Sequence, residues 1–459
     1  MQRQRHSERT TLTPWLCGLM AGLLIGFSVV VDARAQLRID ITRGNVEALP
    51  IAVSSLYGNT PLSERLGREI AEVIAANLER SGLFRPVDNR AFLQKPGEML
   101  VRPRFADWTQ INAQALVTGQ TAVETDGRLR TEFRLWDVFA GQQLVGRVYF
   151  ALPDHWRRVA HIISDAIYKR LTGEDGYFDT RVVYIAESGP PDRRVKRLAI
   201  MDQDGHSHRY LTDGSHLVLT PRFSPTAQVI TYLSFFQDRP RVYLYNIDTG
   251  QQEILGDFQD FPGMTYAPRF SPDGRKVVFS IAREGNSDVH VMDLNTRITK
   301  RLTRHPGIDT SPSYSPDGGR IVFNSDRGGV RQLYVMDDSG KNISRISFGR
   351  GLYATPVWSP RGDLIAFTKQ RSRKFFIGVM RPDGSGERIL TESFLDEAPT
   401  WAPNGRVIMF YRQIPGRNSA SEDRTRLWSV DLTGYNLREM VTPLDASDPA
   451  WSPLSPLNR

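Results

Sequence analysis

The chain has 459 residues, of which 40% are apolar and 24% are charged; these values exclude a largely disordered protein and allow two or three domains. The formal net charge is +8, but neither a concentrated run of lysine and arginine nor a nucleic-acid-binding motif accompanies it, so we expect no nucleic-acid partner. The only cysteine is Cys17, and its position near the N-terminus excludes a cysteine nucleophile or a cysteine metal site in the rest of the chain.

Residues 1–35 have the pattern of a cleaved secretory signal peptide. Three arginines within the first nine residues precede a mostly apolar run, and Ala33-Arg34-Ala35 places small residues where signal peptidase reads the chain. The alternative is an uncleaved membrane anchor, but glycines interrupt the short apolar run and the small residues close it. We therefore expect an exported protein that begins at Gln36 and has no membrane-spanning segment.

Residues 36–48 are expected to form a mobile segment at the new N-terminus. Apolar and polar side chains alternate there as in a β-strand, over Leu37, Arg38, Ile39, Asp40, Ile41 and Thr42. Two interpretations remain open. The segment is either an edge strand of the domain that follows, or a free strand that adds to the sheet of a partner protein, where main-chain hydrogen bonds supply affinity.

Residues 49–175 predict a small α/β domain without internal repeats. The expected strands cover residues 50–53, 115–119 and 129–135, and the second of two amphipathic helices covers residues 154–171. The first helix begins at Thr60-Pro61, an N-cap followed by proline, and its apolar residues recur at helical spacing until Gly82. A linker with two glycines, at residues 173–176, joins this domain to the next.

The remainder of the chain repeats the phrase Pro-x-aromatic-Ser-Pro at steps of 43 to 50 residues. Its six copies are at residues 221–225, 268–272, 312–316, 356–360, 399–403 and 449–453, with alanine in place of serine in the fifth. Two copies continue into an Asp-Gly turn, at residues 273–274 and 317–318, and a strand rich in β-branched residues follows. A strand-rich unit with this period predicts a β-propeller, and six hairpin units predict six blades.

The two ends of the repeat region complement each other. The first unit begins at Arg181 and lacks the phrase, whereas the sixth copy of the phrase has no strands after it. We expect the C-terminal strand to return to the first blade and close the ring, which removes the exposed sheet edges. The predicted fold is therefore an α/β N-terminal domain followed by an all-β six-bladed propeller over residues 176–459.

Sequence patterns for catalysis are missing. The chain has no Gly-x-Ser-x-Gly elbow, no phosphate-binding loop and no His-Glu-x-x-His motif. Residues 202–205 resemble the start of a calcium loop, but the glycine comes too early and a hairpin turn is expected there; the nearby His206 and His208 are a weak ligand pair. Asp396 and Glu397 are adjacent, and adjacent strand residues face opposite sides, which disfavours an acid/base pair. We expect no enzymatic activity, no cofactor and no metal site.

The exported α/β domain followed by six blades resembles the TolB family, the periplasmic components of Tol–Pal envelope systems. The resemblance covers essentially the whole mature chain, and its most specific phrases are at residues 333–337, 394–399 with 402–405, and 449–453. It implies a non-enzymatic periplasmic adaptor that supports outer-membrane integrity and envelope constriction at cell division. A propeller that binds glycan or peptide, and a propeller enzyme, are the alternatives.

The resemblance also implies two partners. The N-terminal segment, from Leu37 to Thr42, would engage the inner-membrane protein TolA. One mouth of the propeller channel would engage Pal, the peptidoglycan-associated lipoprotein of the outer membrane. Residues just before each repeated phrase are the expected lining of that mouth, and those assigned to the Pal site are Met264, Tyr266, Ala267, Thr310, Ser311, Thr355 and Glu397. A purely structural role for these lining residues is the open alternative.

Overall fold

The computed structural model describes residues 37–40, 47–236, 240–255, 263–416 and 423–455. The predicted signal peptide lies outside these ranges, as do Ile41 and Thr42. None of the helices within the described ranges has the length and apolar character that a membrane span requires.

The N-terminal domain is a mixed sheet with helices on both faces. Its strands are β1 (Leu49–Val53), β2 (Tyr57–Gly58), β3 (Phe84–Pro86), β4 (Ala115–Val123), β5 (Leu129–Asp137) and β6 (Gln142–Ala151), and its α-helices are α1 (Pro61–Arg80), α2 (Phe105–Gln110) and α3 (Trp156–Thr172). The sheet order is β3-β1-β4-β5-β6, with β2 beside β4. The pairs β1–β3, β1–β4 and β2–β4 are parallel, and the others are antiparallel.

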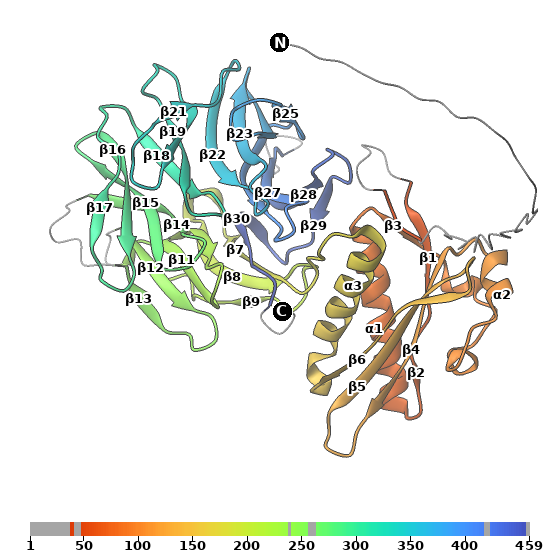
Figure 1. Ribbon diagram of the computed structural model, residues 1–459. Coiled ribbons are helices and arrows are strands. Elements are labelled where there is room, and N and C mark those ends of the chain that lie inside the picture. Colours follow the sequence, from red (N-terminus) through yellow and green to blue (C-terminus); the bar gives the residue numbers. More distant parts are fainter. Residues whose placement is uncertain (1–36, 41–46, 237–239, 256–262, 417–422, 456–459) are drawn as a thin grey trace, which may run out of the picture. The chain divides into compact units, whose positions relative to one another are not determined.

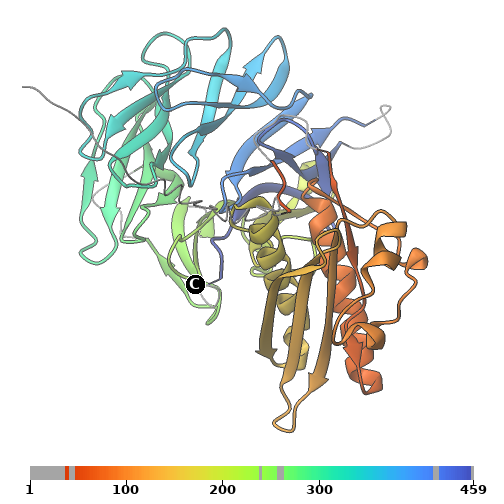
Figure 2. The ribbon, with the colours of Figure 1, turned by 45° about the vertical axis from the view of Figure 1, so that its right-hand side comes forward.

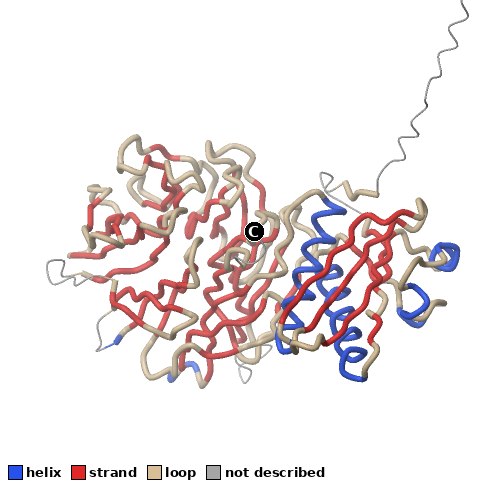
Figure 3. Tube along the Cα trace, turned by 60° about the horizontal axis from the view of Figure 1, so that its bottom comes forward, coloured by secondary structure: helices blue, strands red, loops and turns tan. Residues whose placement is uncertain are grey.

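The long helices pack side by side on one face of this sheet (Figures 1 and 3). Helix α1 begins as predicted, because the Thr60 hydroxyl accepts the backbone N–H of Ser63 at 3.2 Å, and the Ser63 hydroxyl accepts that of Thr60 at 3.0 Å. Gly82, at φ +75°, follows its last turn. Trp108 of α2 packs on the opposite face with Leu116 and Trp136, so both faces of the sheet are covered.

The rest of the chain forms six four-stranded antiparallel sheets, which we number as blades 1–6 from the N-terminal side. Blade 1 holds β30 (Asp445–Trp451), β7 (Arg181–Ser188), β8 (Val195–Asp202) and β9 (Arg209–Tyr210); blade 2 holds β10 (Val218–Phe223), β11 (Val229–Ser234), β12 (Arg241–Asn246) and β13 (Gln252–Ile254); blade 3 holds β14 (Met264–Phe270), β15 (Lys276–Arg283), β16 (Asn286–Asp293) and β17 (Thr299–Arg301). Blade 4 holds β18 (Asp309–Tyr314), β19 (Arg320–Ser325), β20 (Gln332–Asp337) and β21 (Ser344–Arg345); blade 5 holds β22 (Leu352–Trp358), β23 (Ile365–Arg371), β24 (Lys374–Met380) and β25 (Arg388–Ile389); blade 6 holds β26 (Leu395–Trp401), β27 (Val407–Ile414), β28 (Arg424–Asp431) and β29 (Arg438–Met440). The blades follow one another around a ring (Figure 2).

Each repeated phrase forms the end of an innermost strand, which is the first in the order of its blade. The hairpin strand that the sequence indicated as the start of each unit is therefore the second strand of the blade. Its central aromatic residue is fully buried in all six blades, at Tyr184, Tyr232, Phe279, Phe323, Phe367 and Phe410. The aromatic residue of the phrase packs between neighbouring sheets: Trp358 of blade 5 shares a core cluster with Val322 and Leu333 of blade 4.

The C-terminal strand closes the ring as predicted. Strand β30 pairs antiparallel with β7, with Ala446 opposite Ala186 and Trp451 opposite Val182 (Figure 1). The first blade therefore combines residues from both ends of the repeat region. This pairing supplies the inner strand that blade 1 lacks in the sequence, so no blade is left with an open inner edge.

Candidate partner-binding sites

A β-bulge interrupts the innermost strand of every blade at the same place. The regular pairing with the second strand shifts between Leu219 and Arg222 in blade 2, and between equivalent residues in the other five blades. One residue in each bulge has a left-handed backbone, with φ between 45° and 55°: Thr220, Ala267, Ser311, Thr355, Ala398 and Asp448. Proline follows each of them.

These six residues hold strained conformations. None is glycine, two are β-branched threonines, and a residue before proline ordinarily adopts an extended backbone. A left-handed conformation at such a position costs about 1–3 kcal/mol and persists only where the surrounding structure imposes it. Because the bulge recurs in all six blades, every inner strand bends once at the same level of the channel wall. Bulges of this kind change the direction of side chains and are frequent near binding sites.

The structure brings six of the seven residues assigned to the Pal site to this level of the channel wall. Ala267, Ser311 and Thr355 are bulge residues themselves. Tyr266, Thr310 and Glu397 are the last regularly paired residues before the bulge in their own blades. All six are half-buried. They come from blades 3 to 6 and form a continuous part of one ring.

The three residues that precede the bulge, Tyr266, Thr310 and Glu397, are held by side chains of their own blade. The Tyr266 hydroxyl lies 2.7 Å from the Ser287 hydroxyl, and Asn324 Nδ2 donates to Thr310 Oγ1 at 2.6 Å. Tyr411 donates to Glu397 Oε2 at 2.7 Å. Burial raises the pKa of Glu397, while the Tyr411 hydroxyl opposes that shift by stabilising the charged form. These contacts fix the side chains in advance of any partner.

Met264, the seventh residue, belongs to an apolar rim at the entrance of the same channel. Leu217 and Ile308 hold its register position in blades 2 and 4, and the three side chains are 40%, 41% and 44% exposed in the order Leu217, Met264, Ile308. Leu352 and Leu395, half-buried, hold the position in blades 5 and 6. Sequence reasoning identified only Met264, although an apolar residue two places before the lining pair recurs in five blades.

Asp396 and Glu397 do not form a catalytic pair. Asp396 is fully buried, where Arg412 donates to its two oxygens at 2.7 Å each, and the Thr391 hydroxyl donates at 2.6 Å. Glu397 instead faces Tyr411. The two carboxylates therefore have separate partners, as expected for adjacent strand residues.

The turn at residues 202–205 is a hairpin turn, in which Gly205 N–H donates to Asp202 O at 2.9 Å. Asp202, Asp204 and His161 of α3 each place one potential metal ligand within 4.8 Å of the others. However, Arg157 forms an ion pair with Asp204, and a metal ion bound there would have to compete with that guanidinium. Because the arginine already neutralises Asp204, the group is explained as a buried polar network.

The described part of the N-terminal segment, Leu37–Asp40, lies against the end of α3. The Ile39 N–H donates to Leu171 O at 2.8 Å, and the Ile39 side chain is buried in the core of the domain. Leu37 packs against the same cluster. The Arg38 guanidinium lies over Gly173, the residue that ends α3 at φ +81°. These residues form no strand, so they are neither an edge strand nor, in this state, free.

Comparisons with known proteins agree with this architecture. Residues 37–144 match the family described as the TolB amino-terminal domain, and residues 168–455 match the TolB beta propeller domain. A Tol-Pal system protein TolB from Paramagnetospirillum magneticum is 59% identical over 434 residues, which cover 95% of this chain and 96% of that protein. The crystal structure of TolB from Acinetobacter baumannii matches with a TM-score of 0.77 at 30% identity, over 91% of this chain and 100% of that one. The chain belongs to the TolB family of Tol–Pal system proteins.

Proposed function

We propose that this protein is a non-enzymatic periplasmic adaptor that binds Pal at one mouth of its propeller channel and TolA through its N-terminal segment. In this role it supports outer-membrane integrity and envelope constriction at cell division. The observation that carries the Pal site is the combination of an apolar rim with a ring of half-buried, pre-positioned residues just inside it. Exposed apolar groups bordered by polar ones are typical of protein-docking surfaces.

The Pal site is tested by calorimetric titration with the periplasmic domain of Pal from the same organism. Met264→Asp and Ile308→Asp place a charge on the rim, so each is expected to weaken binding at least about tenfold. Ile298→Asp is the matched control, because Ile298 is 69% exposed beside the outer strand β17. Equal affinities of the rim and control variants would remove Pal from the proposed site.

The TolA site is tested by deleting residues 36–47. The adaptor loses TolA binding and keeps Pal binding, whereas a simple glycan- or peptide-binding propeller loses nothing. The position of Ile39 in the domain core supports a further part of the proposal, in which the segment binds TolA only after it is released. Pal binding then changes the affinity for TolA, and by linkage TolA changes the affinity for Pal by the same factor. Identical TolA affinity with and without saturating Pal contradicts this coupling.

A further inference from the structure

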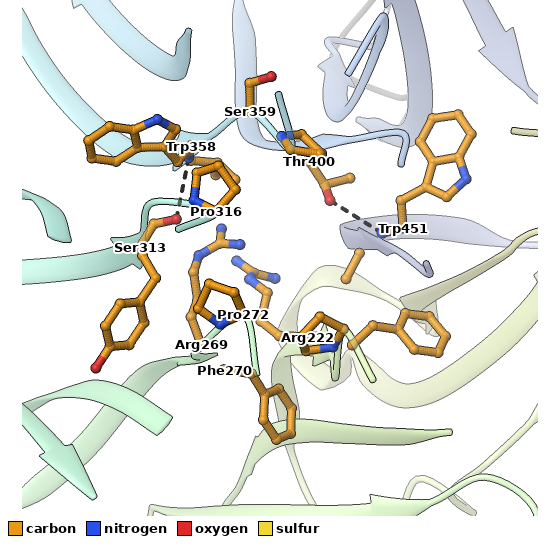
Figure 4. Close-up of a pocket in the computed structure, with 16 residues that line it drawn as sticks. Arg222, Arg269, Phe270, Pro272, Ser313, Pro316, Trp358, Ser359, Thr400 and Trp451 are labelled. Carbon is orange, nitrogen blue, oxygen red and sulfur yellow. Dashed lines mark hydrogen bonds between the residues drawn. The ribbon is translucent and has the colours of Figure 1, made fainter. Parts of the chain in front are cut away.

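A second ring of equivalent residues lines the channel toward its other end, two residues beyond the bulge. These residues stand between the proline and the aromatic residue of each repeated phrase: Arg222, Arg269, Ser313, Val357, Thr400 and Ala450. They line a cavity of about 290 Å³ together with prolines and aromatic residues of the same phrases (Figure 4). Two members of the ring are arginines, and they come from the adjacent blades 2 and 3.

The two guanidinium groups lie side by side at the centre of the ring (Figure 4). Among the described residues, no carboxylate lies within ion-pair distance of either guanidinium; Arg222 Nη1 donates to the backbone oxygen of Pro221 at 2.6 Å. Burial, and then the charge of Arg222, lowers the pKa of Arg269 well below its usual value. Two half-buried cations thus lie side by side, where their repulsion is stronger than between fully hydrated groups.

One carboxylate, that of Asp448, acts on this pair. Its charge partly opposes the lowering of the Arg222 pKa by burial, and burial in turn raises the pKa of Asp448 itself. When Asp448 is ionised, the two guanidinium groups and this carboxylate together carry a net charge of about +1. Arg269 shows no corresponding influence from a carboxylate.

Other polar side chains of the ring are also available as donors. The Ser313 hydroxyl accepts the backbone N–H of Trp358 at 3.3 Å, and the Thr400 hydroxyl accepts that of Trp451 at 3.2 Å (Figure 4). A hydroxyl that accepts in this way still has its hydrogen to donate. The polar side chains of the ring are thus two guanidinium groups and two hydroxyls, a set that favours an anion over a cation.

We propose that this end of the channel is a binding site for an oxyanion, a carboxylate or phosphate group held between Arg222 and Arg269. The planar guanidinium groups donate paired hydrogen bonds to such a group, and the anion removes their mutual repulsion. The site lies deeper in the channel than the apolar rim, since Met264 and Arg269 are five residues apart on the inner strand β14, at most roughly 16 Å, but it adjoins the bulge residue Ala267, two residues from Arg269. The rim variants Met264→Asp and Ile308→Asp and the arginine variants therefore probe different depths of the same channel.

The test measures binding of inorganic phosphate and of malonate by titration calorimetry at constant ionic strength, with the full mature chain. We expect saturable binding, weakened by about 10- to 100-fold in Arg269→Gln and in Arg222→Gln, as for the loss of charge-assisted hydrogen bonds. Arg283→Gln is the control, since Arg283 is exposed and its ionic partner is the adjacent Glu284. Tighter binding of phosphate or of malonate identifies which of the two groups the site prefers.

A second measurement separates this site from a structural role. Without added anion, Arg269→Gln removes the repulsion and is expected to raise the melting temperature, whereas loss of a structural arginine lowers it. Arg269→Lys keeps the charge but not the planar group, and it should fold and bind more weakly. The proposal is overturned if neither anion binds saturably, or if Arg269→Gln and Arg283→Gln bind equally well. A lower melting temperature for Arg269→Gln with unchanged binding also overturns it.

Discussion

Replacement of Trp451 by alanine tests whether the C-terminal strand holds the propeller closed. Trp451 is the last residue of β30 and is 7% exposed. Its Nε1–H donates to Thr180 Oγ1 at 2.8 Å, its backbone N–H donates to Thr400 Oγ1 at 3.2 Å, and its ring meets that of Tyr177 edge-on at 5.8 Å between centroids. The side chain therefore contacts the start of the first blade, while its backbone is tied to the last. Loss of a buried tryptophan costs about 3–5 kcal/mol through lost burial and an unfilled cavity.

Thermal unfolding followed by circular dichroism measures this cost. At about 2–4 °C per kcal/mol for a domain near this size, the melting temperature of Trp451→Ala should fall by about 6–20 °C. Phe348→Ala is the control, since Phe348 is 71% exposed and should shift the transition by less than about 2 °C. Removal of residues 446–459 should abolish cooperative unfolding of the propeller. If Trp451→Ala melts with the control, or the truncated chain melts like the intact one, the closure does not stabilise the ring.

Three further changes test other parts of the molecule. Asp396→Asn leaves the guanidinium of Arg412 buried without its carboxylate, so the free energy of unfolding in urea should fall by about 3–5 kcal/mol. The exposed control Asp383→Asn should change it by less than about 0.5 kcal/mol. Equal losses in the two variants would show that the Asp396–Arg412 pair does not stabilise the fold. Because burial lowers the pKa of His161 to about 4 from an ordinary value near 6.5, its contribution to stability is complete above pH 6.5 and is lost as the pH falls to 4. Between pH 6.5 and pH 4, the free energy of unfolding of His161→Gln should therefore fall by about 3 kcal/mol less than that of the parent chain. Parallel pH profiles of the two unfolding free energies would contradict the lowered pKa of His161. Ile39→Ala should release the N-terminal segment, so that hydrogen exchange of the residue 39 amide accelerates at least about tenfold; unchanged protection means that the Ile39 side chain does not hold the segment.

The blade architecture was predictable because its determinants are local and repeat six times. Proline and glycine mark the turn after four of the phrases, β-branched residues mark the second strand, and the surplus phrase at residues 449–453 indicated the closure with β7. The turn after Pro225 lacks the usual Asp-Gly, yet Ser224 N–H still donates to Val229 O at 2.8 Å, the same closing bond as in the blades with glycine. The fold therefore tolerates the loss of one turn signal.

The bulge and the arginine pair could not be predicted in the same way. Thr220 and Thr355 are poor candidates for a left-handed backbone, and the residue before proline is ordinarily extended, so local preferences indicated the wrong conformation. Tertiary pairing in each blade imposes it instead. Arg222 and Arg269 occupy the variable position of the phrase and are 47 residues apart, so only the ring geometry shows that they are neighbours. The alternation in the N-terminal segment fits a strand, whereas its described residues 37–40 dock on the end of α3.

The pairing of β30 with β7 also determines when the first blade can be completed during synthesis. Ala446 and Ala186 are partners but lie about 260 residues apart, so a chain that emerges N-terminus first completes β7 long before its partner arrives. At 5–20 residues per second the interval is roughly 13–50 s. During that time the first blade has an unpaired edge able to join a strand of another chain. A chain that folds from its N-terminus therefore keeps this strand edge unpaired until its last residues arrive.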